Sequence, residues 1–248
     1  MTGILELHGI SLSFGGLKVA QSVDLRLDAG ARHALIGPNG AGKTTLINLI
    51  TGVLAPSSGS VRLNGIDVTR LSQGQRVKRG IVRTFQISQL FPTMSAVENV
   101  VMAIAERDGL ARVFWRPLVR FDAAFDEAHL LLERVGLGPH ALTPIVHLSY
   151  GRRRLVELAI ALALKPRVLL LDEPAAGVPS LETDLILDCL AALESDIAIL
   201  LIDHDMDLVF RFAREITVLV SGAVYAHGAP DEIARDPEVK TIYFGEAA

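Results

Sequence analysis

A glycine-rich run that ends in Lys-Thr-Thr is the stretch of this sequence whose residue types point most directly to chemistry. GPNGAGKTT, residues 37–45, matches the pattern G-x-x-x-x-G-K-[ST], with an expected strand before it and an expected helix after it. Glycines let the backbone curl so that N–H groups face phosphate oxygens, and the start of the helix adds free N–H groups and a positive dipole end. Lys43 supplies a mobile charge for the outer phosphates, and the Thr44 hydroxyl can bind Mg²⁺. A glycine turn with a chance Lys-Thr would not explain this context, so we predict a nucleotide site made by Asn39, Gly40, Gly42, Lys43, Thr44 and Thr45.

Two acids at the end of an apolar run are the second chemical feature. Residues 168–171 are expected to form a buried strand, and Asp172 and Glu173 follow it directly. We expect this strand to lie beside the one at 31–36, which would bring Asp172 close enough to orient waters on the metal. Glu173, one residue further on, can polarise a water that attacks the outermost phosphate. Without the glycine-rich run, a solvated turn before a proline would be the better interpretation.

The elements that must position these residues alternate between strands and helices. Short apolar runs bounded by turn residues predict strands, and apolar residues three or four positions apart predict helices. The region 95–135 breaks the alternation, because it is helical throughout and carries one apolar stripe. We therefore expect an α/β fold, with helices on both faces of a mainly parallel sheet and an inserted helical lobe. Strands are expected within 4–27 and 55–65 and at 31–36, 81–85, 168–171, 197–202, 216–220 and 223–226, and helices at 43–51, 151–164, 181–193 and 205–213.

Composition and charge argue against several other classes of protein. The formal net charge of −4 over 248 residues lacks the positive excess that is typical of nucleic-acid-binding proteins. The single cysteine, Cys189, excludes an internal disulfide and is expected to be a small core residue, not a reactive thiol. The start of the chain does not resemble a signal peptide, and no run reaches the roughly 18–20 apolar residues that span a bilayer. We therefore expect a chain that is soluble by itself.

Several motifs that occur in one order make the sequence resemble the ATP-binding subunits of ABC transporters. The resemblance covers essentially the whole chain, and the combination is far more specific than the glycine-rich run alone. The motifs are GPNGAGKTT, Gln86 in RTFQ, LSYG at 148–151, LLLDEP at 169–174 and His204 in LLIDHD.

That resemblance implies a P-loop NTPase core with a mainly parallel sheet, an N-terminal antiparallel β subdomain and an inserted α-helical subdomain. It places the core in 1–86 and 148–248 and the helical subdomain in 87–147. ATP is the implied nucleotide and Mg²⁺ the implied metal. Phe14 takes the place of an aromatic residue that stacks on adenine, although it could instead be a core residue of an edge strand. The implied catalytic residues are Lys43, Gln86, Glu173 and His204, and the implied metal ligands are Thr44, Gln86 and Asp172.

The LSYG motif carries the other half of the implied site. The family usually has Leu-Ser-Gly-Gly-Gln there, and this loop binds the γ-phosphate of the ATP that the other subunit holds. This chain has LSYGR at 148–152, so it keeps Ser149 and Gly151 as nucleotide-binding residues. A complete site therefore needs two cassettes face to face. Arg153 and Arg154 are expected at the surface, salt-bridged or facing solvent, rather than in a nucleic-acid patch.

Three positions depart from the family's common pattern, namely Tyr150 and Arg152 in this loop and Pro179, where an acid or Asn is usual. The segments at 83–100, 172–177, 200–210 and 220–233 resemble the ATPases of branched-chain amino acid importers. That branch implies a second ABC ATPase subunit, identical or different, together with transmembrane permease subunits and, indirectly, a periplasmic binding protein. It implies a peripheral place on the cytoplasmic face of the inner membrane. The cargo, a branched-chain amino acid or a related small polar or organic-acid substrate, is selected by those partners. A soluble ABC ATPase that is not coupled to transport is the alternative.

Overall fold

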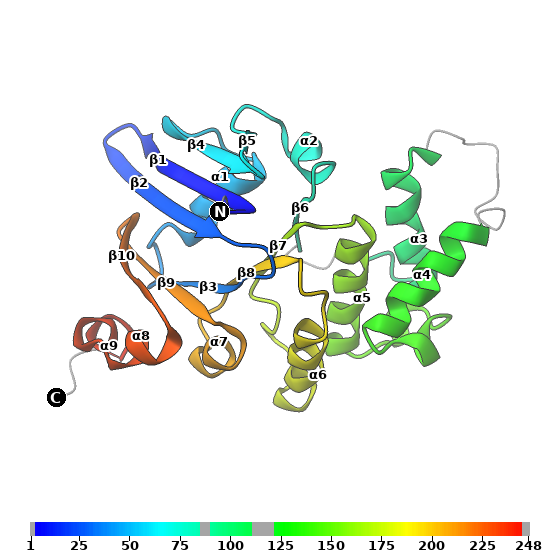
Figure 1. The fold of residues 1–248 in the computed structure, drawn as a ribbon. Coiled ribbons are helices and arrows are strands. Elements are labelled where there is room, and N and C mark those ends of the chain that lie inside the picture. Colours follow the sequence, from blue (N-terminus) through cyan, green and yellow to red (C-terminus); the bar gives the residue numbers. More distant parts are fainter. Residues whose placement is uncertain (1–2, 85–89, 111–121, 245–248) are drawn as a thin grey trace. The chain divides into compact units, whose positions relative to one another are not determined.

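The computed structural model describes residues 3–84, 90–110 and 122–244. The chain forms two compact units, here named the sheet unit and the helical unit (Figure 1). The sheet unit consists of Met1–Val82, Arg167–Glu173 and Glu194–Ala248, and the helical unit consists of Arg83–Pro166 and Pro174–Leu193.

An antiparallel sheet occupies the N-terminal part of the sheet unit. Its strand order is β2-β1-β4-β5, and each neighbouring pair is antiparallel. Leu5 and Leu7 of β1 are buried while the residues between and after them are more exposed, which reflects the two-residue period of a strand. The expected antiparallel β subdomain is confirmed. Its strands are β1 (Leu5–Phe14), β2 (Leu17–Leu27), β4 (Ser58–Leu63) and β5 (Ile66–Asp67).

A six-stranded sheet of order β10-β9-β3-β8-β7-β6 confirms the expected fold class. The pairs β3–β8, β3–β9 and β7–β8 are parallel, and the β9–β10 hairpin is antiparallel. The expectation that β7 lies beside β3 is wrong, because β8 lies between them. These strands are all apolar runs, so their composition cannot specify their order, which depends on the crossover connections. The strands are β3 (Arg32–Ile36), β6 (Ile81–Arg83), β7 (Val168–Asp172), β8 (Ala198–Ile202), β9 (Glu215–Val220) and β10 (Ala223–Gly228).

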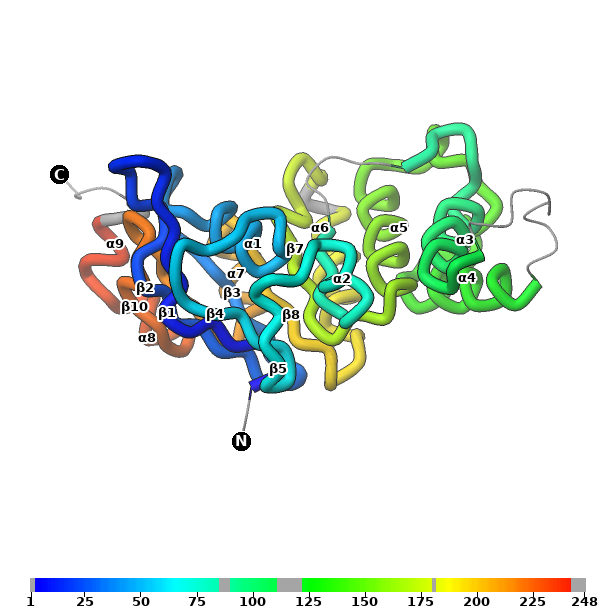
Figure 2. Tube along the Cα trace, turned by 90° about the horizontal axis from the view of Figure 1, so that it is seen from above, coloured from blue at the N-terminus to red at the C-terminus, as the bar shows by residue number. Residues whose placement is uncertain are grey.

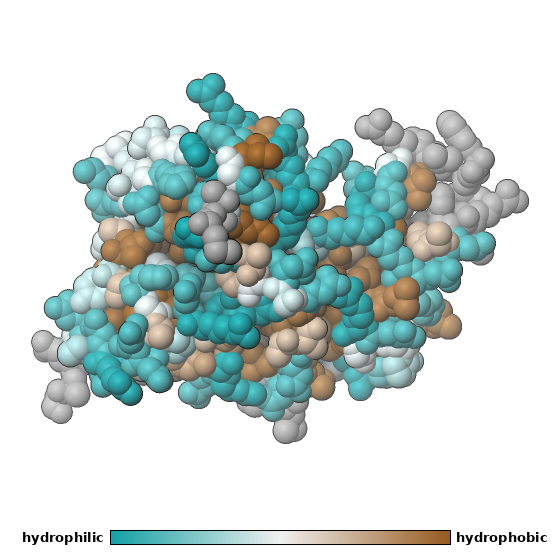
Figure 3. Space-filling model, viewed as in Figure 1, coloured by the Kyte–Doolittle hydropathy of each residue, from teal (hydrophilic) through white to brown (hydrophobic). Residues whose placement is uncertain are grey.

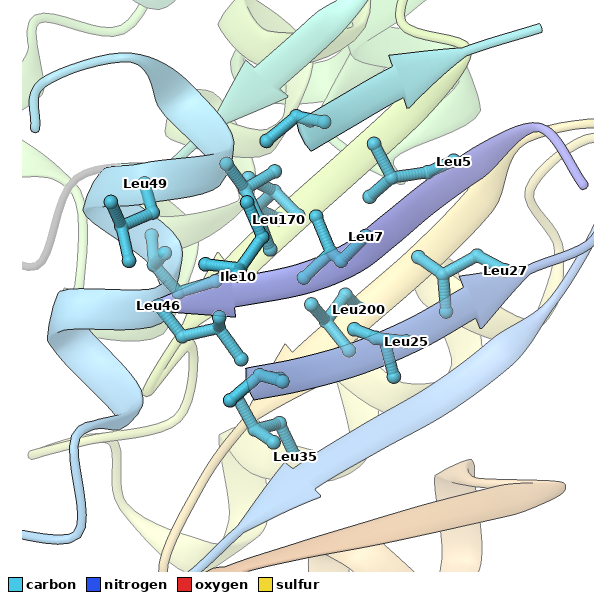
Figure 4. Close-up of a cluster of buried hydrophobic side chains, with 14 of the residues drawn as sticks. Leu5, Leu7, Ile10, Leu25, Leu27, Leu35, Leu46, Leu49, Leu170 and Leu200 are labelled. Carbon is cyan, nitrogen blue, oxygen red and sulfur yellow. The ribbon is translucent and has the colours of Figure 1, made fainter. Parts of the chain in front are cut away.

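Successive side chains of β3 point to opposite faces of its sheet, and each face has its own apolar core. Leu35 belongs to the larger core, which α1 and the antiparallel sheet share with Leu170 and Leu200 (Figure 4). Ala34 and Ile36 belong to the core of the opposite face, with residues of α7, α8 and α9. Helices therefore cover both faces, as expected, although α2, α8 and α9 were not predicted. The helices are α1 (Lys43–Thr51), α2 (Gln73–Val77), α7 (Met206–Phe212), α8 (Pro230–Arg235) and α9 (Pro237–Phe244).

Helices α3, α4 and α5 pack against one another in the helical unit, and α6 contacts α5 (Figure 2). The predicted apolar stripe is present in α4, where Ala124 and Leu131 are among the buried residues. Cys189 of α6 is buried and its pKa is raised to about 11 by that burial, which confirms a core residue instead of a reactive thiol. The unit contains α3 (Ala96–Arg107), α4 (Asp122–Arg134), η3 (Gly138–His140), η4 (Ile145–His147), α5 (Tyr150–Ala163) and α6 (Ser180–Ala191).

The surface in Figure 3 is mainly hydrophilic, with apolar residues scattered between the polar ones. Among the helices of the part that the structure describes, none is long and apolar enough to cross a membrane.

Candidate functional site

The glycine-rich run forms a loop between β3 and α1, here named the phosphate loop (residues 37–42). Gly42 is the N-cap of α1 and has a φ of 100°, in the left-handed region that favours glycine. A Cβ at this position would also lie 2.6 Å from the carbonyl oxygen of Val19. Gly40 has a φ of 80° too, but a Cβ there would meet nothing within 4 Å. Glycine is therefore required at 42 by packing, whereas at 40 it leaves the backbone open to a ligand.

The start of α1 is free of the groups that usually satisfy helix N–H donors. No side chain caps the helix, and its first turn contains no acidic residue. The Lys43 ammonium folds back over the phosphate loop, where it donates to the carbonyl oxygens of Gly37 at 2.5 Å and Pro38 at 3.0 Å. Burial lowers the pKa of Lys43, while the carboxylates of Glu173 and Asp172 act in the opposite direction. Uncapped donors beside a partly buried ammonium fit the phosphates of a nucleotide.

The turn between β9 and β10 is hydrogen-bonded to the phosphate loop. The N–H of Gly222 in this turn donates to the carbonyl oxygen of Ala41 at 2.9 Å. Gln21 of β2 donates through its N–H to Gly222 and through its side-chain amide to Ser221. A Cβ on Gly222 would lie 2.7 Å from the carbonyl oxygen of Val19, the same atom that approaches Gly42. Sequence reasoning missed this support, for which the only signal was a Ser-Gly turn far along the chain.

The two acids lie at the carboxyl end of β7. Asp172 is the last residue of the strand and is 6% exposed. Glu173 has a φ of 49°, which is unfavourable by roughly 1 kcal/mol for a residue with a Cβ. Its N–H still donates to the carbonyl oxygen of Ile202 in β8, as in a strand. The strained backbone of Glu173 therefore lies at the point where the chain leaves the sheet. His204 follows the neighbouring strand, and its Nδ1 lies 3.5 Å from Oε1 of Glu173.

A buried acid next to His204 was missed by sequence reasoning. Asp203 is 3% exposed, and its Oδ1 accepts hydrogen bonds from the N–H groups of His204 at 2.8 Å and Asp205 at 3.0 Å. Among the described residues, its Oδ2 has no hydrogen-bond partner. Burial raises the pKa of Asp203, and the two N–H donors oppose this shift. Asp203 therefore holds the backbone that carries His204, and the acid-His-acid run LIDHD was the signal for it.

The parallel direction of the strands explains how these groups come close together although β7 is not next to β3. Strands β3, β7 and β8 are parallel, so their carboxyl ends share one edge, where ligands of open α/β sheets bind. Asp172 ends β7 and Glu173 follows it, so both carboxylates lie at this edge, where their charges oppose the lowering of the Lys43 pKa by burial. Thr44, Asn39 and Gly40 are exposed, Thr45 is partly buried, and Gln86 lies outside the described residues.

Phe14 ends β1 and pairs with Leu17 across the turn to β2. Its side chain is 54% exposed, so the alternative that Phe14 is a core residue is wrong. An exposed ring at a strand end leaves a face available for stacking on a base.

The LSYG motif, residues 148–151, starts α5 in the helical unit. Ser149 is the N-cap, and its hydroxyl accepts from the N–H of Arg152 at 3.5 Å. The N–H of Gly151 is taken by a carboxylate, because it donates to Oε2 of Glu182 in α6 at 2.9 Å. Sequence reasoning did not find Glu182, which lies 31 residues away along the chain.

The arginines that follow the LSYG motif are held by local partners. Arg153 donates to the carbonyl oxygens of Leu148 and Val146, both just before the helix. Arg154 is only 9% exposed, so the expectation that it lies at the surface is wrong, while its expected salt bridge is confirmed with Glu157 at 2.9 Å. It also donates to the Tyr150 hydroxyl at 2.8 Å and lies 5.1 Å from that ring's centroid. Tyr150, the departure from the common loop sequence, thus adds a second partner for this buried arginine beside Glu157.

Known proteins are similar to this chain over nearly its whole length. A family model described as ABC transporter matches residues 20–176. The chain is 39% identical to the high-affinity branched-chain amino acid transport ATP-binding protein BraF of Pseudomonas aeruginosa, over 98% of both chains. It is 37% identical to the protein of the same description named LivG in Escherichia coli K12, also over 98% of both.

Solved structures extend the likeness to the fold. A nucleotide-free ATP-binding cassette from an ABC transporter matches with a TM-score of 0.86 and 32% identity, over 98% of this chain and 99% of that one. The ADP conformation of MJ1267, an ATP-binding cassette of an ABC transporter, matches with a TM-score of 0.86 and 31% identity, over 99% of this chain and 100% of that one.

Proposed function

Because the chain belongs to the ABC transporter family, we propose that it is an ATP-hydrolysing subunit that powers uptake of a small solute through membrane-embedded partners. One observation carries the proposal: a lysine ammonium over an open phosphate loop shares a sheet edge with the Glu173–His204 pair. The relatives at 37–39% identity are named for branched-chain amino acid transport, which supports that cargo or a related small polar or organic-acid substrate.

The phosphate loop binds and orients the nucleotide. Lys43 exchanges the carbonyl oxygens of Gly37 and Pro38 for the outer phosphates, and the free N–H groups of α1 and of the loop around Gly40 bind the remaining oxygens. The exposed ring of Phe14 stacks on the adenine. Asn39, Gly42 and Thr45 complete the same cradle.

Hydrolysis depends on the acids and the histidine. Thr44, Asp172 and Gln86 would hold Mg²⁺, which supplies charge neutralisation to the phosphates when bound. The Glu173 carboxylate accepts a proton from the attacking water. His204, whose Nδ1 lies 3.5 Å from Oε1 of Glu173, donates to the γ-phosphate. Asp203 keeps the His204 backbone in place through its two N–H contacts.

The second half of each site comes from a partner subunit. Ser149 and Gly151 at the start of α5 bind the γ-phosphate held by the phosphate loop of a second cassette, identical or different. ATP then closes the pair and hydrolysis releases it, which is a two-state element that a ligand biases. The transmembrane permease subunits convert this motion into transport, and a periplasmic binding protein delivers the cargo. The chain accordingly works at the cytoplasmic face of the inner membrane.

Replacement of Glu173 by Gln tests this assignment. The purified transporter complex with Glu173→Gln should release phosphate about 100-fold more slowly or worse, because the proton acceptor is gone, while its Kd for ATP changes less than about twofold. Glu194→Gln, an exposed acid of the same unit, is the matched control and should leave both values unchanged.

Near-normal phosphate release by Glu173→Gln would overturn the assignment. If the chain is purified without membrane subunits and hydrolyses ATP by itself at its full rate, the soluble ATPase that is not coupled to transport is the correct function.

A further inference from the structure

A carboxylate already occupies one of the N–H groups at the start of α5. Gly151 is the second residue of this helix, so its N–H has no acceptor within the helix. Oε2 of Glu182 accepts from it at 2.9 Å. A Cβ on Gly151 would lie 2.5 Å from that oxygen and 2.8 Å from Cβ of Glu182. Glycine at 151 therefore lets the first turn of α6 approach the start of α5 closely enough for this bond.

Comparison with the N-termini of other helices explains why Glu182 contacts a residue outside its own helix. In α2, α3 and α8 the Gln or Glu at the third helical position accepts from the N–H of its own N-cap residue, at 2.9, 2.7 and 3.0 Å. Glu182 holds the same position in α6, but the N-cap there is Pro179, which has no N–H. The carboxylate cannot close the local contact, so it is free to take the N–H of Gly151.

This placement puts a negative charge between two helix starts. Glu182 lies in the first turn of α6 and contacts the first turn of α5, and both positive dipole ends favour a carboxylate there. A phosphate that approaches the LSYG motif needs the same N–H and meets a like charge. The bond therefore stabilises the unpaired chain and opposes the arrival of the phosphate.

We propose that Glu182 is an internal competitor for the γ-phosphate of the partner's nucleotide, and that it sets the ATP concentration at which two cassettes pair. Gly151 exchanges the carboxylate for the phosphate on pairing. Pro179 is part of this device, because the residue that lacks an N–H is what directs Glu182 to Gly151. The proposal rests on the proposed function, which assigns Ser149 and Gly151 to that phosphate.

Two variants, both expected to lower the KM for ATP, test the competition between the Glu182 carboxylate and the γ-phosphate. Glu182→Gln keeps an acceptor oxygen of the same reach and removes the charge. In the purified transporter complex it should lower the KM for ATP about three- to ten-fold and change kcat less than about twofold. Pro179→Asn restores an N-cap N–H, so Glu182 can close the local contact and the KM should fall in the same direction.

A matched control separates local from general charge effects. Asp188→Asn removes the same charge from an exposed position of α6, about 9 Å further along the helix axis, and should leave the KM unchanged. An unchanged KM in Glu182→Gln, or a loss of kcat alone, would make Glu182 a structural residue and overturn the proposal. A wild-type complex without ATP hydrolysis would overturn the proposed function instead.

The contact itself can be tested in the isolated full-length chain, independently of turnover. The Gly151 amide has no helical acceptor, so its protection from hydrogen exchange depends on Glu182. Glu182→Ala should bring its exchange close to the rate of an exposed amide, while Asp188→Asn should not. Equal protection in Glu182→Ala and wild type would refute the proposal, because no competitor would then hold the N–H.

Discussion

The buried guanidinium of Arg76 offers the sharpest test of how the phosphate loop is supported. Arg76 lies in α2 and is 1% exposed, with no carboxylate among its hydrogen-bond acceptors in the described part of the chain. It donates instead to backbone carbonyls. They belong to Leu49 at 2.6 Å, Ile50 at 2.7 Å, Thr69 at 2.7 Å and Leu71 at 3.1 Å. The carbonyls of Leu49 and Ile50 lie in the last turn of α1, where no intrahelical N–H can reach them. Arg76 therefore caps the far end of the helix that begins with Lys43.

The free energy of unfolding that is lost on replacing Arg76 follows from the carbonyl groups that then have no donor. Arg76→Met keeps most of the apolar stem and removes all four donor contacts. Leu49 and Ile50 are both fully buried, and each orphaned buried acceptor costs about 1–3 kcal/mol, so the two together cost about 4 kcal/mol. The burial that lowers the pKa of Arg76 offsets part of this, since the variant no longer desolvates a charge. A net loss of about 3 kcal/mol is expected.

Urea denaturation followed by circular dichroism measures this loss. With a slope of roughly 3 kcal/mol per molar, the midpoint of Arg76→Met should fall by about 1 M. Arg79→Met, three positions away and exposed, is the matched control and should stay within about 0.5 kcal/mol of wild type. A loss below about 1 kcal/mol in Arg76→Met would refute the reasoning, because the carbonyls of α1 would then be satisfied without Arg76.

Two further predictions concern buried titratable groups of the sheet unit. Burial, and then the nearby His227, lower the pKa of His33 to about 4, although Glu215 lies 3.5 Å from its Nδ1. Because the folded pKa lies below the unfolded value of about 6.5, this stability is present above pH 6.5 and lost as pH falls towards 4, by about 2 kcal/mol between pH 7 and 5. Urea midpoints at pH 7, 6 and 5 should show that loss in wild type, whereas His33→Gln should show a smaller one. The raised pKa of Asp203 has the opposite sign: its contribution is present below about pH 3.9 and is lost as pH rises through the folded pKa. Asp203→Asn keeps the acceptor for both N–H groups, so its Tm at pH 7.5 should exceed that of wild type by about 2–4 °C in a thermal scan, and a lower Tm would contradict the assignment.

Local patterns in the sequence were sufficient for the phosphate loop and for the strands that end at it. The residues from Gly37 to Thr44 determine the shape of the loop locally, because the backbone freedom of glycine and the start of a helix depend only on neighbouring residues. The order of the strands was not predictable in the same way. Strand β8 separates β7 from β3 because of crossover connections, and the composition of three largely apolar strands does not indicate which one lies in the middle.

Short elements and backbone partners account for most of what the sequence did not reveal. Helix α2 has five residues and α8 has six, so neither completes two turns in which an apolar period could appear. The acceptors of Arg76 are carbonyl oxygens, which every residue has and which no residue type identifies. The partners of the buried Arg154 likewise lie one helical turn before and after it, at Tyr150 and Glu157, and they meet it only when α5 is formed.

Both halves of the candidate site are occupied by groups of the chain itself. The Lys43 ammonium binds two neutral carbonyls, and the N–H of Gly151 binds one carboxylate. Under the proposed function a nucleotide exchanges hydrogen bonds at both places, but the exchanges differ in charge. At Lys43 a multiply charged phosphate replaces neutral oxygens and gains a strong charge-assisted contact. At Gly151 it replaces a group that is already negative and gains only the difference between two anions. Binding of ATP to a single chain should accordingly be the stronger step, and closure of two chains around it the weaker step that ATP concentration controls.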